Sequence, residues 1–154
     1  KIIVAGHHDE RLKRIAEKTD AVICNTNNEN LEKLIASQIT DRPGVDIAIE
    51  ATGSGSAPNI GIKALRPQGT LVLFSYVWKP EILEMGMIHM KELNVIGSCR
   101  SNCYQKALQL MADGKISTLA LADKEMPLQQ YKEAINYLMN NKKNVFKVIL
   151  LPQI

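Results

Sequence analysis

The sequence predicts an α/β fold, a doubly wound parallel sheet with helices covering both of its faces. Three observations lead to this prediction. Short apolar segments alternate with segments of helical periodicity. The apolar segments are hydrophobic at nearly every position, as parallel strands buried on both faces are. Turn residues separate the two kinds of segment, so helices connect successive strands through crossovers, which are right-handed in such sheets.

The first two strands are expected at residues 2–5 and 21–24, which are short apolar runs. Gly6 ends the first of them, and Asp9 is placed to cap the helix that follows. A second helix is expected over residues 31–39, where apolar side chains recur at helical spacing after a polar, turn-rich segment.

The third and fourth strands are expected at residues 45–49 and 70–74. The helix between them, over residues 58–65, begins at Pro58, a residue type favoured in the first helical turn. Residues 67–69, Pro-Gln-Gly, then predict a turn before the fourth strand.

The second half of the chain continues the alternation. A strand at 93–99 precedes a helix at 104–111, which Gly114 is placed to end. A last helix at 131–138 leads to a closing strand at 145–151. The segment between the fourth and fifth strands is rich in Met, which fills irregular space, so we expect it to form core or a subunit contact.

The composition is that of one globular domain. The chain has 154 residues, of which 45% are hydrophobic and 23% are charged. Its net charge of +3 gives no reason to expect a nucleic-acid or membrane partner, and no apolar run is long enough to span a bilayer. Cys24, Cys99 and Cys103 lack the spacing of a disulfide framework or a zinc site, so we expect reduced thiols, a cytoplasmic location and no metal ligands.

Ligands of such sheets bind beyond the carboxyl ends of the strands. Here those ends are followed by Gly6-His7-His8, Thr52-Gly53-Ser54 and Ser75-Tyr76. The glycine-rich phosphate loop that usually follows a first strand is not found, and the cluster Gly53-Ser54-Gly55 follows the third strand with a different spacing. The candidate site is therefore defined by position at the strand ends.

The end of the first strand bears on the choice of dinucleotide. In dinucleotide folds an acidic residue often follows a strand and binds the adenosine ribose, but Gly6 stands here. His7, His8 and Arg11 would tolerate or attract a ribose phosphate, which favours NADP. Asp9 or Glu10 would instead reach the ribose from the next turn and restore NAD.

Six segments together resemble a known family. In chain order they are residues 44–53 (GVDIAIEATG), 65–74 (LRPQGTLVLF), 91–98 (KELNVIGS), 107–116 (ALQLMADGKI), 127–128 (PL) and 146–150 (FKVIL). They are similar to the C-terminal, cofactor-binding part of zinc-dependent medium-chain dehydrogenases of the alcohol, sorbitol and threonine dehydrogenase kind. The resemblance implies a Rossmann-like fold without its first strand and glycine-rich loop, so residues 1–154 are expected to be a partial dinucleotide-binding domain.

The resemblance also implies the cofactor contacts, with NAD or NADP as cofactor. Gly6 and His7 match the adenosine ribose position, and Lys147 matches a basic residue that reaches the pyrophosphate. Three further segments match residues that line the cofactor cleft or meet the nicotinamide: Ala51, Thr52 and Gly53; Phe74, Ser75 and Tyr76; Ser98, Cys99 and Arg100. No catalytic residue and no metal ligand of the family matches a position in this chain.

For the whole protein, the resemblance implies hydride transfer between NAD(P) and an alcohol or polyol. The catalytic zinc is expected only in a catalytic domain that this chain lacks, and the isolated chain is expected to be inactive. Residues 93–98 are expected to pair with a second subunit, giving a homodimer or a tetramer. Two alternatives stay open, a zinc-free quinone-reductase-like relative and a non-catalytic nucleotide-binding or dimerisation module.

Overall fold

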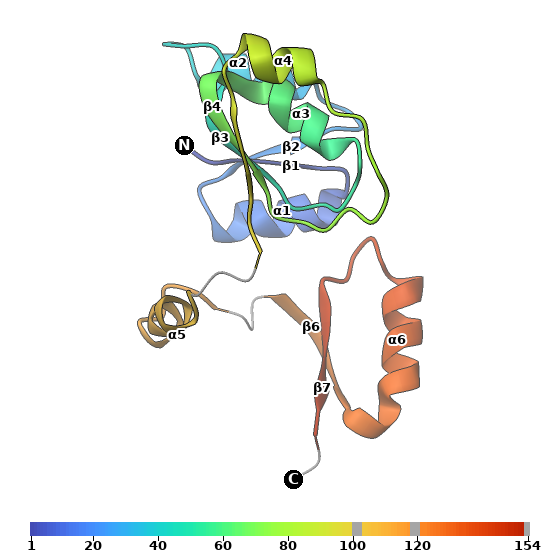
Figure 1. The fold of residues 1–154 in the computed structure, drawn as a ribbon. Coiled ribbons are helices and arrows are strands. Elements are labelled where there is room, and N and C mark those ends of the chain that lie inside the picture. Colours follow the sequence, from blue (N-terminus) through green and yellow to red (C-terminus); the bar gives the residue numbers. More distant parts are fainter. Residues whose placement is uncertain (100–102, 118–120, 153–154) are drawn as a thin grey trace. The chain divides into compact units, whose positions relative to one another are not determined.

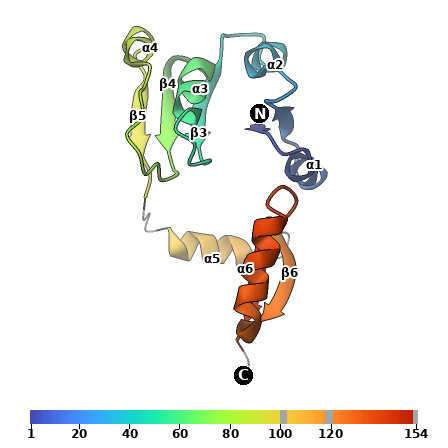
Figure 2. The same cartoon turned by 90° about the vertical axis from the view of Figure 1, so that its right-hand side faces the viewer.

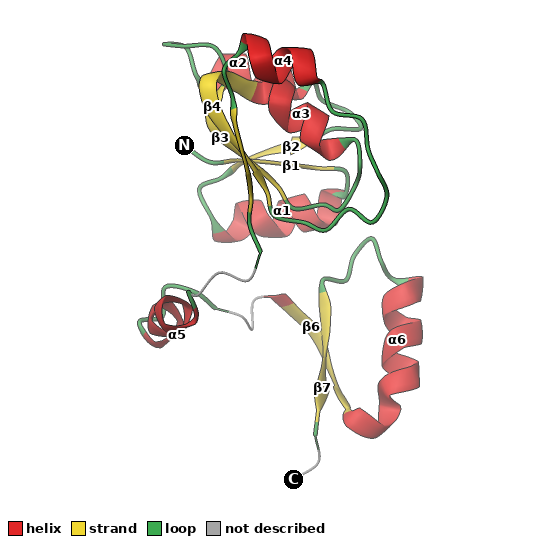
Figure 3. Ribbon diagram, viewed as in Figure 1, coloured by secondary structure: helices red, strands yellow, loops and turns green. Residues whose placement is uncertain are grey.

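The computed structural model describes residues 1–99, 103–117 and 121–152. Parallel strands alternate with helices along the chain, which confirms the α/β fold (Figures 1 and 3). The chain divides into two compact units. Unit 1 consists of Lys1–Asn25 with Asn102–Ile154, and unit 2 of Thr26–Ser101. None of the described helices has the length and apolar character needed to cross a membrane.

Unit 2 is built on a parallel sheet with the strand order β3-β4-β5. Ala48 on β3 pairs with Leu71 on β4, which pairs in turn with Val95 on β5. The elements in chain order are α2 (Leu31–Gln38), β3 (Val45–Glu50), α3 (Ala57–Ala64), β4 (Leu65–Leu73), α4 (Met85–Met90) and β5 (Asn94–Gly97). Because the three strands run in one direction, their carboxyl ends lie at one edge of the sheet.

The core of unit 2 lies between this sheet and its helices (Figure 2). Ile62 of α3 is fully buried against Leu65 and Leu71 of β4. A Cβ atom at Gly61 would lie 2.8 Å from Leu71 Cδ1, so a glycine lets α3 approach β4 closely. The Met-rich segment is divided: Met87 packs against the core, whereas Met85 and Met90 are exposed. The expectation of a core role thus holds for Met87.

The turn predicted at residues 67–69 lies within β4 instead of before it, because the strand spans Leu65–Leu73. The pairing with β3 steps from Val45–Leu65 to Ile47–Thr70, so β4 contains a bulge. Gln68 takes a left-handed φ of 59° there, and its N–H donates to the Lys91 carbonyl at 2.7 Å. The extra residues are looped out of the ladder, which lets the strand continue through a Pro-Gln-Gly sequence that resembles a turn.

Unit 1 contains two pairs of parallel strands, β1 with β2 and β6 with β7. Helix α6 lies alongside β6 and β7 (Figure 1). The elements in chain order are β1 (Ile3–Gly6), α1 (Asp9–Lys18), β2 (Val22–Asn25), α5 (Tyr104–Ala112), β6 (Ala122–Pro127), a 3-10 turn at Leu128–Gln130, α6 (Tyr131–Asn140) and β7 (Lys147–Leu151).

The start of α1 and the end of α5 can be compared with the caps predicted at Asp9 and Gly114. Gly114 ends α5 as expected: it has a φ of 68°, and its N–H donates to the Met111 carbonyl at 3.0 Å. Asp9 does not cap α1, because it is the first helical residue and His8 takes the cap position. The Asp9 carboxylate instead accepts a hydrogen bond from the side-chain amide of Asn25.

Charged side chains of α1 connect the two segments of unit 1. Arg14 forms an ion pair with Asp123 of β6 at 2.6 Å, and Asp123 also accepts hydrogen bonds from the backbone N–H groups of Phe146 and Lys147. The guanidinium groups of Arg11 and Arg14 lie 5.4 and 4.7 Å from the centre of the Phe146 ring. The first helix is therefore attached to the start of the last strand.

Lys91 stabilises unit 2 by binding the end of α3. Its Nζ donates to the carbonyls of Ile62, Lys63 and Leu65 at 3.1, 2.9 and 2.7 Å, which lie in the last turn and cap of that helix. We predict that Lys91→Met lowers the free energy of unfolding by about 1–2 kcal/mol, because those carbonyls lose a charged donor.

Urea denaturation followed by circular dichroism measures this loss. Lys63→Met is the matched control, since Lys63 forms an exposed ion pair with Glu84 at 2.8 Å, and it should change stability far less. Equal effects of the two substitutions would contradict the role given to Lys91.

Candidate functional site

The predicted residues of unit 2 meet at one edge of the sheet. Ala51–Gly53 follow β3, Phe74–Tyr76 follow β4, and Ser98 and Cys99 follow β5. Ser98 N–H donates to the Leu73 carbonyl at 2.9 Å, which extends the β4–β5 pairing toward the edge. Arg100 lies outside the described residues. The parallel topology thus brings together three segments that are far apart in the sequence.

Glu50, the last residue of β3, links two of these loops. Its side chain is buried, with 5% of the residue exposed. One carboxylate oxygen accepts hydrogen bonds from Thr52 N–H at 2.7 Å, the Thr52 hydroxyl at 2.8 Å and Gly53 N–H at 3.1 Å. The other accepts a hydrogen bond from the Ser75 hydroxyl. One side chain therefore fixes the loop after β3 to the loop after β4.

Further hydrogen bonds strengthen the same link. Gly53 N–H also donates to Ser75 Oγ at 2.9 Å, and the N–H groups of Phe74 and Ser75 donate to the Glu50 carbonyl at 3.0 and 3.1 Å. Gly53 has a φ of +73°, a conformation that glycine adopts without strain. These contacts hold the backbone of both loops in one arrangement.

Electrostatically, Glu50 is a carboxylate that is stable in its ionised form. Burial raises its pKa, but the hydrogen bonds from Ser75, Thr52 and Gly53 outweigh burial and hold the pKa below its ordinary value. Sequence reasoning did not single out this residue. The available signal was an acidic residue ending an apolar strand, with hydroxyl and glycine residues just after it.

The rest of this edge is exposed and aromatic. The side chains of Phe74 and Tyr76 are largely exposed, and the Tyr76 ring lies edge-on to Trp78 with 4.4 Å between ring centres. Peptide groups, hydroxyls and aromatic faces can bind a flat polar ligand by stacking and hydrogen bonding.

In unit 1, the predicted residues His7 and His8 lie side by side after β1. The rings of His7 and His8 lie 4.1 Å apart, centre to centre. Partial burial, and then the nearby charges of His7, Arg11 and Lys143, lower the pKa of His8 from its usual value. Lys143, which sequence reasoning did not consider, therefore lies close enough to influence His8, although it stands far away in the sequence.

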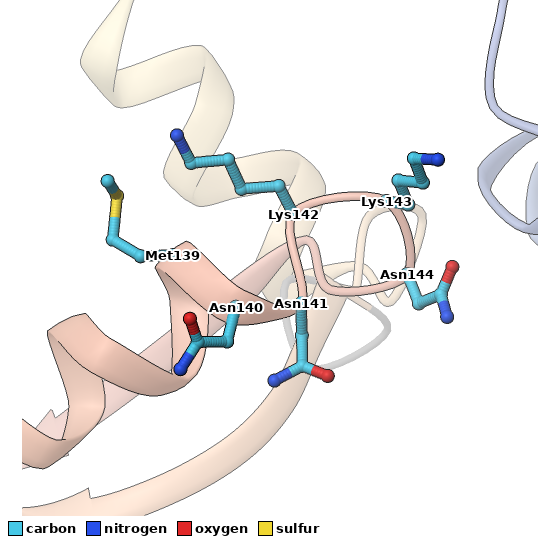
Figure 4. A pocket seen from close by; sticks show the side chains of 6 residues that line it. All are labelled: Met139, Asn140, Asn141, Lys142, Lys143 and Asn144. Atoms are coloured by element: carbon cyan, nitrogen blue, oxygen red, sulfur yellow. The ribbon is translucent and has the colours of Figure 1, made fainter.

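Arg11 forms structural contacts within unit 1. Its guanidinium donates to the carbonyls of Lys142 and Val145, the latter at 3.0 Å, so it holds the turn between α6 and β7. That turn, with the end of α6, surrounds a pocket of about 310 Å³ lined by residues 139–144 (Figure 4). The side chains of Lys142 and Lys143 extend outward from the turn.

Lys147 is the first residue of β7 and is exposed. Its backbone N–H donates to the Asp123 carboxylate at 3.0 Å. This bond fixes the start of β7 but does not involve the Lys147 ammonium group. Within residues 1–99, 103–117 and 121–152, no group of three or more His, Cys, Asp or Glu side chains is placed to hold a metal ion. The described residues therefore do not fit a zinc site.

Parallel strands joined by helices, with polar loops at the carboxyl ends of the strands, are the arrangement found in dinucleotide-binding α/β proteins. Residues 1–113 match the zinc-binding dehydrogenase family, and the chain belongs to that family.

Individual relatives agree with this assignment. The D-arabitol-phosphate dehydrogenase of Enterococcus avium is 32% identical over 140 residues, which cover 88% of this chain and 39% of that protein. The crystal structure of 2R,3R-butanediol dehydrogenase from Bacillus subtilis has a TM-score of 0.86 at 25% identity, covering 99% of this chain and 44% of the other. The chain thus spans about two fifths of the length of these proteins.

Solved structures of the same fold contain either NADH or NADP. One of them is a short chain alcohol dehydrogenase from E. coli CFT073 complexed with NADH, with a TM-score of 0.85 at 23% identity over 97% of this chain and 44% of the other. At 23% sequence identity, the similarity to this structure shows that the two chains share a fold.

The lowered pKa of Glu50 predicts how stability depends on pH. An unfolded Glu titrates near pH ~4.3, so the folded form, which titrates lower, gains stability from Glu50 above that value and loses it as pH falls toward the folded pKa. We predict that the unfolding free energy of the wild type falls between about pH 5 and pH 3, and that Glu50→Gln makes this fall shallower.

Urea denaturation at a series of pH values measures both slopes. Glu17→Gln, which neutralises an exposed carboxylate on α1, serves as the control and should leave the wild-type slope unchanged. An E50Q profile parallel to that of the wild type would show that Glu50 is not a stabilising carboxylate.

Proposed function

We propose that this chain is the cofactor-binding part of a dehydrogenase that transfers hydride between NAD or NADP and an alcohol or polyol. The observation that supports it most is the family membership, because the loops at the strand ends lie where dinucleotides bind in this class. Two proteins reported above, named for an arabitol phosphate and a butanediol, point to polyols and diols as the substrate class.

Unit 2 would bind the nicotinamide half of the cofactor. Ala51, Thr52 and Gly53 would offer backbone groups, and Phe74, Ser75 and Tyr76 would offer backbone and ring faces, with Ser98 and Cys99 beside them. The nicotinamide supplies the hydride chemistry when bound. These residues bind and orient the ring, and the zinc of the family would belong to a further part of a longer protein. The chain by itself is therefore expected to bind cofactor without turnover.

Unit 1 would bind the adenosine and phosphate groups. Gly6 places no carboxylate at the end of β1, Lys143 adds positive charge near His8, and a bound phosphate would favour the protonated form of His8. Lys147 is an exposed cation suited to a diphosphate. This charge favours a ribose phosphate, so we propose a preference for NADP over NAD.

Cofactor titration tests the proposal directly. Trp78 is the only tryptophan and lies against Tyr76, so bound dihydronicotinamide should quench its fluorescence. We predict that NADPH binds more tightly than NADH, and that its affinity rises as pH falls from about 8 to about 6. The rise follows because a bound phosphate favours the protonated form of His8, whose pKa is otherwise lowered.

Substitution of His8 provides the matching variant. His8→Gln should weaken NADPH binding about ten-fold at pH 6 and remove its pH dependence, as expected for loss of one charged hydrogen bond. His89→Gln, which changes an exposed histidine on α4, is the control and should have no effect. Tighter binding of NADH than of NADPH would contradict the preference, and no binding of either would overturn the proposed function.

We further propose that β5 forms a contact between two copies of the chain. It is an edge strand of its sheet, and all four of its residues, Asn94–Gly97, are exposed. Edge strands with free backbone groups pair readily with another strand. Two copies of β5 would continue the sheet across a two-fold axis, which gives a homodimer or a tetramer of dimers.

A charge on β5 should disrupt that contact. We predict that Ile96→Arg shifts the chain from dimer to monomer, because two arginines would face each other near the axis. Light scattering coupled to size-exclusion chromatography measures the mass. Ile82→Arg places the same charge at an isoleucine that is 87% exposed outside the sheet, and it should leave the dimer intact. A wild-type chain that is monomeric at high concentration would contradict the proposal.

A further inference from the structure

The buried carboxylate of Glu50 has a function beyond the pairing of strands. The four donors that the structure gives its oxygens are neutral groups, and all of them belong to the two loops that follow β3 and β4. A strand requires no such side chain at its end, because its ladder is formed by the backbone. The carboxylate therefore organises the loops rather than the strand.

Its position determines which groups become ordered. Glu50 binds the N–H groups of Thr52 and Gly53 and the hydroxyl of Ser75, and Ser75 Oγ in turn accepts from Gly53 N–H at 2.9 Å. These are exposed loops, and an exposed loop that must become ordered on binding reduces the affinity for a ligand. Glu50 removes part of that cost because the loops are already joined in the free protein.

We propose that Glu50 is a positioning residue for the dinucleotide, holding residues 51–53 and 74–76 in the conformation that receives its nicotinamide half. The inference rests on the proposed function, since it concerns the same loops. Glu50 acts through Thr52, Gly53 and Ser75, and its own oxygens are occupied by these groups. It thus controls affinity for one half of the cofactor without direct contact.

A comparison of two ligands with Glu50→Gln tests this role. The amide keeps the size of the side chain but replaces one acceptor oxygen by a donor, which faces the donors of the loops. NADPH, which contains the nicotinamide, should bind E50Q about ten-fold more weakly than wild type. AMP with a 2′-phosphate, which lacks the nicotinamide half, should bind both proteins equally, as measured by calorimetry.

Asp46→Asn is the matched control. Asp46 is a carboxylate on the same strand, but it pairs with Arg42 and with Arg66 at 2.7 Å. The D46N variant should change neither the affinity for NADPH nor the affinity for the 2′-phosphorylated AMP. A general loss of structure in E50Q would weaken both ligands together, whereas a positioning role weakens NADPH alone. Equal NADPH affinity in E50Q and wild type, or equal loss for both ligands, would overturn the inference while the proposed function stands.

Ser75→Ala keeps the inference testable if E50Q does not fold. It removes the hydroxyl that joins Glu50 to Gly53, so it should also weaken NADPH and spare the 2′-phosphorylated AMP. If E50Q folds, the double variant E50Q/S75A should lose less affinity than the sum of the two changes, because both break one network. Unchanged NADPH binding in S75A would overturn the inference, and a wild-type chain that binds neither ligand would overturn both the inference and the proposed function.

Discussion

Unit 2 depends on the parallel pairing of β4 with strands on both of its sides. Parallel strands cannot be joined by a tight hairpin, so the chain must return to the other end of the sheet between them. Helices α3 and α4 lie within these return connections. They cover the sheet, so that Ile62 of α3 is buried against Leu65 and Leu71 of β4. The same direction of the strands brings the segments after β3, β4 and β5 to one edge. The topology that forms the core thus also gathers the loops of the candidate site.

In unit 1, charged groups contribute to contacts between segments far apart in the sequence. Arg14 pairs with Asp123, whose carboxylate also receives two backbone N–H groups at the start of β7. Burial raises the Asp123 pKa, but these bonds and Arg14 outweigh it and hold the pKa below the usual value. Arg11 holds the adjoining turn. Arg11 and Arg14 therefore form structural contacts, whereas Lys143 is an exposed cation.

The elements that could be predicted are those whose apolar pattern is set locally. The strand expected at 45–49 is found at Val45–Glu50, and the helix expected at 104–111 at Tyr104–Ala112. Strand β6 was missed because its sequence, ADKEMP, is largely polar and is ordered by pairing with β7. The position of the site residues at the strand ends was predicted from topology, but the Glu50–Ser75 bond and the bonds of Arg11 are tertiary contacts, which no local pattern encodes.

Packing at the end of β1 does not explain why glycine stands at position 6. A Cβ atom at Gly6 would lie 3.5 Å from Leu12, an ordinary contact, and Gly6 does not adopt a left-handed backbone conformation. A Cβ atom would therefore fit at this position, and neither a close contact nor the backbone conformation requires glycine here. In the proposed site, the charge near a bound ribose would then be set by His8 and Lys143, which come from two distant parts of the sequence. Discrimination at the ribose would accordingly arise from electrostatics, which salt weakens, rather than from the shape of the site.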